Sequence, residues 1–111
     1  MENFIKVLSE TIILLENKEM HIRIFDKIKT KSGYGLSIQC SEYHYCTPRE
    51  TINVEKYDSF ELAIFRGHNF VYPKILDNFP RKNELDECYK GEVFGYVPKD
   101  LVEDLYNFLN D

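Results

Sequence analysis

The sequence is poor in the features that mark several large protein classes. Its 111 residues include no tryptophan, three cysteines, five glycines and four prolines. There is no internal repeat, no low-complexity tract and no linker long enough to separate two folded units. We therefore expect a single domain spanning residues 1–111, which can bury one core but has no room for a separate cofactor domain.

Signals for export and membrane insertion are also missing. The opening residues Met1–Asn3 carry no basic segment, and the apolar run Ile12–Leu15 is far shorter than a bilayer span. We therefore expect a cytoplasmic protein without membrane contact. An odd number of cysteines without a secretion signal argues against a disulfide framework, so the thiols should stay reduced.

Positive charge is scarce in the last third of the chain. Residues 77–111 contain nine acids and four bases, residues 1–76 contain ten of each, and the net charge is −5. An acidic surface repels phosphate, so we do not expect direct binding to nucleic acid. A basic protein surface that normally holds nucleic acid is a plausible partner instead. The alternative is that these acids only solvate a helix face and a loop.

The hydrophobic pattern predicts helices at both ends of the chain. Apolar residues recur at three- and four-residue steps from Asn3 to about Asn17, which is typical of an amphipathic helix. A second helix should begin at Pro98, because proline suits the first helical turn. In that helix the apolar side chains should face the core and the acids should face water; the expected core residues are Leu101, Leu105, Phe108 and Leu109.

Between the helices, alternating apolar residues predict about four strands. The first two, Met20–Lys29 and Leu36–Cys40, should form a hairpin around a glycine-containing turn. The strand Ser59–Arg66 is apolar enough to be central, and a fourth covers Glu92–Val97. Residues Gly67–Lys90 are expected to form a long irregular segment. The predicted fold is α+β, with a mainly antiparallel sheet of about four strands and both terminal helices packed on it.

What the sequence does contain is a set of zinc-ligating residue types. Cys40, His44 and Cys46 lie within seven positions, and Cys88 and His68 follow downstream. Zinc prefers thiolate and imidazole ligands in a closed tetrahedral shell when its role is structural. We therefore predict a structural zinc site formed by Cys40, His44, Cys46 and Cys88, with His68 as the alternative to His44.

The spacing sets a condition on this zinc site. Cys40 and Cys46 would stand roughly 20 Å apart in an extended strand, so the chain must turn between them. Two other interpretations remain open: the thiols are separate and packed as small hydrophobic groups, or a Cys/His pair acts as a nucleophile. No glycine-rich oxyanion turn follows His44 and Cys46, so no catalytic residue is assigned and we expect no enzymatic activity.

Several segments resemble small phage and prophage proteins of Gram-positive hosts. The similar segments are Gly33-Tyr34-Gly35-Leu36-Ser37-Ile38-Gln39-Cys40, His44-Tyr45-Cys46-Thr47-Pro48-Arg49-Glu50 and Phe94-Gly95-Tyr96-Val97-Pro98. Compact phage proteins of this size and charge include type II-A anti-CRISPR proteins directed at Cas9. The resemblance implies a phage-encoded inhibitor acting in the host-cell cytoplasm, with a host protein such as Cas9 as its partner.

Cas9 holds nucleic acid in a positively charged channel, so an acidic domain could dock there and block DNA loading. The candidate partner-binding acids are Glu84, Asp86, Glu87, Glu103 and Asp104. The candidate aromatic residues, chosen because buried rings dominate binding energy at interfaces, are Phe70, Tyr72 and Phe79. Alternative functions are a regulatory or assembly protein of a mobile element and a small cysteine-dependent enzyme.

Overall fold

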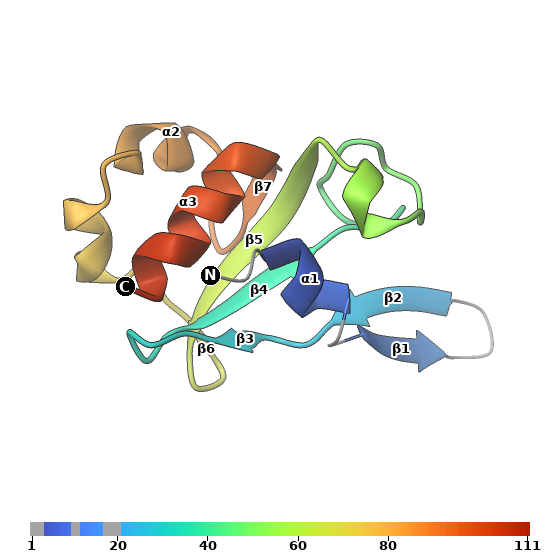
Figure 1. The fold of residues 1–111 in the computed structure, drawn as a ribbon, viewed down its shortest axis with the longest axis horizontal. Helices are drawn as coiled ribbons and strands as arrows, with labels where there is room; N and C mark the ends of the chain where they lie inside the picture. The colour runs from blue at the N-terminus through green and yellow to red at the C-terminus, as the bar shows by residue number, and fades with distance from the viewer. Residues whose placement is uncertain (1–3, 10–11, 17–20) are drawn as a thin grey trace.

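The fold combines two antiparallel sheets with short helices (Figure 1). The computed structural model describes residues 4–9, 12–16 and 21–111. In chain order the elements are α1 (Phe4–Ser9), β1 (Ile12–Glu16), β2 (His21–Phe25), β3 (Ile28–Lys29), β4 (Gly35–Gln39), the 3-10 helix η1 (Val54–Lys56), β5 (Ser59–Arg66), β6 (Asn69–Phe70), the 3-10 helix η2 (Lys74–Asn78), α2 (Lys82–Glu87), β7 (Phe94–Pro98) and α3 (Lys99–Leu109). The predicted α+β class, with helices near both ends of the chain, is confirmed.

Strand β5 is the centre of the larger sheet. It pairs antiparallel with β4 on one side and with β6 and β7 on the other, so the prediction of a central strand over Ser59–Arg66 is confirmed. Phe60, Leu62 and Ile64 alternate along it and are almost fully buried. Because side chains alternate across a strand, this places an apolar stripe on one sheet face and leaves Glu61, Ala63 and Phe65 on the other.

Helix α3 covers the apolar face of β5 and β7 (Figure 1). It begins immediately after Pro98, as predicted. Leu101, Leu105 and Leu109 are buried as expected, and Val102 is buried as well, so the apolar stripe is wider than the predicted one. Phe108 lies at the edge of this stripe and is only partly buried.

The N-terminal helix is shorter than predicted, and this expectation was wrong over its second half. Helix α1 ends at Ser9, and Ile12–Glu16 form strand β1, which pairs antiparallel with β2. Ile12–Leu15 is a run of four apolar residues that fits either period, and its β-branched isoleucines favour extended backbone. The predicted ends at Asn3 and Asn17 lie outside the described residues.

The predicted strand Met20–Lys29 is divided into β2 and β3, and Met20 itself lies outside the described residues. Strand β3 forms the expected hairpin with β4, with Ile28 opposite Leu36. Strand β2 belongs to the second sheet, and its last residue, Phe25, is buried. The two sheets are joined by Gln39, whose side-chain amide pairs with both the N–H and the C=O of Phe25, at 2.9 and 2.8 Å.

The segment Gly67–Lys90 is more ordered than the predicted irregular stretch, because it contains β6, η2 and α2. Two prolines explain part of this order: Pro73 precedes η2, and Pro80 lies two residues before α2. Within residues 4–9, 12–16 and 21–111, no helix has both the length and the apolar character required to cross a bilayer.

Candidate protein-binding surface

Several large aromatic side chains are exposed in the described part of the chain. Six of them are 40–45% exposed: Tyr43, Tyr45, Phe70, Tyr72, Tyr89 and Tyr96. Tyrosine combines a large apolar ring with a polar tip and is enriched at protein interfaces. These side chains are therefore the first candidates for a binding surface.

Four of these tyrosines form two ring pairs beside β7. Tyr45 and Tyr96 have ring centroids 5.9 Å apart, and Tyr72 and Tyr89 have ring centroids 5.8 Å apart. The Tyr96 N–H donates to the Tyr45 carbonyl at 2.9 Å, and the Tyr89 ring contacts Phe94 with centroids 4.9 Å apart. We call Tyr45, Tyr72, Tyr89 and Tyr96 the β7 tyrosines.

A β-bulge positions the Tyr45–Tyr96 pair. Phe60 pairs with Val97 and Leu62 with Phe94, so Gly95 and Tyr96 together lie opposite the single residue Glu61. A Cβ added at Gly95 would meet the Tyr45 Cβ at 3.1 Å, which is closer than such atoms normally approach. A side chain at position 95 would thus push the Tyr45 loop away from β7 by a few tenths of an ångström.

Tyr96 itself has a backbone conformation that residues with a side chain rarely adopt. Its φ is +54°, and it is the only residue other than glycine with positive φ in the described part of the chain. The left-handed region costs about 1–2 kcal/mol for an L-residue, and strained residues of this kind gather at functional sites. This bulge position therefore holds a large exposed ring, although glycine or asparagine would make the fold more stable there.

Charged groups accompany the β7 tyrosines. The Arg49 guanidinium lies over the Tyr45 ring at 5.6 Å from its centroid, and the Lys82 ammonium lies 5.7 Å from the Tyr72 centroid. Lys82 also pairs with Asp86 at 3.0 Å, and the Tyr72 hydroxyl donates to the same carboxylate. Asp86 and Tyr72, both predicted as partner-binding residues, therefore form one unit.

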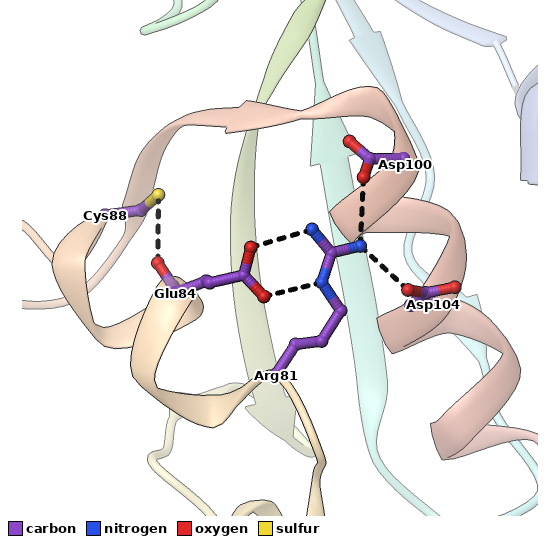
Figure 2. Close-up of polar contacts among 5 residues, drawn as sticks. All are labelled: Arg81, Glu84, Cys88, Asp100 and Asp104. Carbon is purple, nitrogen blue, oxygen red and sulfur yellow. Dashed lines mark hydrogen bonds and ion pairs between the residues drawn. The ribbon is translucent and has the colours of Figure 1, made fainter.

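Three carboxylates gather on one guanidinium, which links α2 to α3 (Figure 2). Arg81 binds Glu84 through two bonds of 2.7 and 2.9 Å. It also contacts Asp104 at 2.8 Å and Asp100 at 3.0 Å. The guanidinium lowers the pKa of Glu84. Arg81 thus neutralises part of the negative charge of Glu84 and Asp104. Three carboxylates share this single cation, so the cluster keeps a net negative charge.

The remaining predicted acids differ in their surroundings. Glu103 accepts a hydrogen bond from the Phe4 N–H at 3.3 Å and so ties α1 to α3. With Glu55, Asp58 and Asp100 it lines an open groove of about 900 Å³ at the start of α3. Glu87 is exposed on α2. The acidic character of the C-terminal third is therefore present on the surface, around the beginning of α3.

The three predicted aromatic residues differ in exposure. Phe79 follows η2 directly, is only 4% exposed, and packs its ring on Phe108 with centroids 5.1 Å apart. Phe70 and Tyr72 are 45% and 40% exposed. Their role in partner binding stays a prediction, and in this structure Phe79 serves the core.

The predicted zinc ligands lie in several different environments. Cys40 and Cys46 are buried, Cys88 is at the end of α2 and donates to the Glu84 carbonyl at 3.6 Å (Figure 2), and His68 is in the exposed turn between β5 and β6. His44 bonds the Ser41 hydroxyl through Nδ1 at 2.7 Å. Within the described part of the chain, no three His, Cys, Asp or Glu side chains are arranged to hold a metal ion. The zinc site therefore stays a prediction.

The surroundings of the thiols favour their protonated form. Burial raises the pKa of Cys40 to about 12, which outweighs the opposing effect of the Arg23 guanidinium 3.6 Å from its sulfur. Burial also raises the pKa of Cys46, whose thiol donates to the carbonyls of Ser41 and Pro48. This arrangement matches the interpretation of separate, packed thiols and works against a thiolate nucleophile.

Sequence reasoning missed three of the β7 tyrosines. The motif Phe94-Gly95-Tyr96 was noted without a role, and Tyr45 and Tyr89 were not assigned. The available signal was the glycine inside the predicted strand Glu92–Val97, since an isolated glycine in a strand indicates a bulge or a close backbone approach. In comparisons with known proteins, no family model, no curated protein and no solved structure matches the chain.

Proposed function

We propose that this chain is a non-enzymatic, protein-binding inhibitor that docks through the β7 tyrosines, and that its target is a Cas9-type nuclease whose DNA loading it blocks. The single observation that carries the proposal is the exposure of four tyrosines beside one bulged strand. Tyrosine rings that already pack against one another lose little conformational freedom on binding, so they supply contact area at low entropic cost.

Charge supports the choice of partner. The net charge of −5 comes from the C-terminal third, and that segment contributes Asp100, Glu103 and Asp104 to the surface around the start of α3. Cas9 offers the complementary surface, because its nucleic-acid channel is positively charged. Electrostatic attraction would speed the encounter, while the tyrosines would supply most of the binding energy.

The thiol environment supports a function without turnover. A nucleophilic cysteine needs a lowered pKa and an adjacent base, whereas burial raises the pKa values of Cys40, Cys46 and Cys88. We therefore propose that the cysteines have a structural role. An inhibitor that only occupies its target acts at one molecule per target.

Zinc binding at Cys40, His44, Cys46 and Cys88 is a separate proposal. It requires these side chains to leave their present protein partners and move together. Elemental analysis of purified protein tests it directly. One zinc per chain, together with a large loss of thermal stability in Cys46→Ser, would support it. If the purified protein contains no metal and the serine variants have melting temperatures close to that of the parent, the cysteines contribute only to packing.

The experiment for the main proposal measures DNA binding by Cas9–guide complexes from several sources, with and without the purified protein. We expect target DNA to be excluded once the protein reaches one equivalent of the complex, with no further effect of incubation time. Unaltered DNA loading in every case would reject the Cas9 target. A time-dependent, sub-stoichiometric effect would indicate an enzyme instead.

A further inference from the structure

A small pocket lies on the sheet face that turns away from α3. Cross-strand pairing places Gln39 opposite Glu61 and Ser37 opposite Ala63, and Phe65 follows on the same face. His44 and Phe70 complete the wall. The pocket has a volume of about 150 Å³. Sites for drug-sized ligands and cofactors span roughly 300–1,000 Å³, so this pocket matches a single amino-acid side chain.

Glu61 gives the pocket a negative charge. Its carboxylate is partly buried and accepts one hydrogen bond, from the Tyr45 N–H at 3.3 Å. Among the described residues, no lysine or arginine nitrogen lies within 4.0 Å of this carboxylate. Burial raises the pKa of Glu61, while the Tyr45 N–H and the charge of Arg49, which forms no ion pair with it, act in the opposite direction. A cation bound directly to the carboxylate would remove more of the cost of its burial.

Other polar side chains of the wall already have partners. The Nδ1 atom of His44 bonds the Ser41 hydroxyl at 2.7 Å. Both N–H groups of the Gln39 side chain are used, by the Phe25 carbonyl and by Ser37, and its oxygen accepts from the Phe25 N–H. The charged group that the pocket offers to a cationic ligand is therefore the Glu61 carboxylate.

Two neighbouring rings line the pocket. Phe65 and Phe70 pair across the strands with centroids 4.6 Å apart and ring planes inclined by 37°. The Lys27 ammonium lies 4.5 Å from the Phe65 centroid, so Phe65 already has a cation within cation–π distance. Phe70 is 45% exposed, and no cation is placed on its ring within the described part of the chain.

We propose that this pocket receives an arginine side chain of the partner protein, with Glu61 binding the guanidinium and Phe70 stacking on its plane. Arginine fits better than lysine because its planar fork pairs with a carboxylate through two bonds and stacks on aromatic rings. The inference rests on the proposed protein-binding function and adds the chemistry of one contact. The chain's own Arg49, which now lies over Tyr45, is the competing occupant.

The test is an NMR titration of the ¹⁵N-labelled protein with N-acetyl-arginine amide, with N-acetyl-lysine amide as the comparison ligand. We expect saturable shifts of the Glu61, Ala63 and Phe65 amides with a dissociation constant in the millimolar range, and weaker binding of the lysine compound. Glu61→Gln should weaken binding roughly tenfold or more, because the charge-assisted bonds are lost. Asp77→Asn, at an exposed acid on η2, is the matched control and should bind like the parent.

Equal binding by Glu61→Gln and the parent, shifts confined to the groove beside α3, or the absence of saturable shifts would each overturn the proposal. Binding that emerges only in Arg49→Gln would mean that Arg49 fills the pocket, and would overturn it too. The amide spectrum reports whether each variant is folded, and Phe70→Ser provides a second variant with the carboxylate intact. The titration contains no Cas9, so its failure would be distinguishable from failure of the DNA-loading experiment.

Discussion

Tyr96 is the residue at which stability and the proposed function are in conflict. Its positive φ of +54° is unfavourable for any residue with a Cβ, and its ring is more than one-third exposed beside Tyr45. Conformational strain at an exposed aromatic side chain is retained when that side chain has a role outside the fold. Stabilising such a position is expected to cost function.

The strain can be measured by comparing Tyr96→Gly with Tyr96→Ala, since both variants lose the ring and differ only at Cβ. We expect the glycine variant to be more stable by about 1 kcal/mol in urea unfolding, because only the alanine variant has a Cβ in the left-handed region. In an ordinary strand the order is reversed. A more stable alanine variant would contradict the strained backbone.

The buried thiol of Cys40 should make the folded protein less stable at alkaline pH. Burial raises the pKa of its thiol from 9.0 to about 12, so the folded protein holds this proton more tightly than the unfolded chain. Below pH 9 this thiol therefore does not change the free energy of unfolding with pH. As the pH rises from about 9 through 12, the free energy of unfolding falls. Unfolding followed against pH should show this loss, and Cys40→Ala should flatten the curve over that interval. A curve of unchanged steepness would contradict the assignment.

At the scale of elements, Gln39 connects the two sheets. Its amide satisfies the backbone N–H and C=O of Phe25, which are buried at the end of β2. Gln39→Ala should lower the free energy of unfolding by about 2–4 kcal/mol, because two buried backbone groups lose their partners. Ser37→Ala, which removes only one acceptor of the same amide, should cost under about 1 kcal/mol. Equal effects of the two variants would exclude the connecting role.

Arg81 connects α2 to α3 in a different way, through exposed ion pairs (Figure 2). Arg81→Ala should lower the melting temperature by a few degrees at low salt, and the difference should shrink in molar sodium chloride, because salt screens exposed charges. Lys74→Ala, on the exposed side of η2, is the control and should melt like the parent. A loss that does not depend on salt would indicate packing instead of charge.

The sequence correctly predicted the elements whose hydrophobic pattern fits only one type of secondary structure. Ser59–Arg66 contains the continuous apolar run Leu62–Phe65, which is typical of a central strand, and the structure confirms it. Proline suits the first turn of a helix, and α3 begins directly after Pro98. Ile12–Leu15 fits two periods, and its pairing with β2 settles it as a strand. The positive φ of Tyr96 was not predictable, since tertiary contacts with the Tyr45 loop impose it on a residue type that does not favour it.

At the scale of the whole molecule, the surface has two regions with different proposed roles. The β7 tyrosines supply contact area, and the acids around the start of α3 supply the field that attracts a basic partner. Added salt should therefore slow association with the target while leaving dissociation nearly unchanged. Stopped-flow kinetics at two ionic strengths would measure this, and a salt effect confined to the dissociation rate would contradict the division of roles.

The most direct test of the account is the affinity of a Tyr45→Ala, Tyr96→Ala variant for a Cas9–guide complex that the parent protein inhibits, measured beside an Asp77→Asn control on η2. Loss of two clustered interface rings should weaken binding roughly thirtyfold or more, while the control should change it only slightly. An unchanged affinity of the tyrosine variant, with its fold intact by circular dichroism, would contradict docking through the β7 tyrosines.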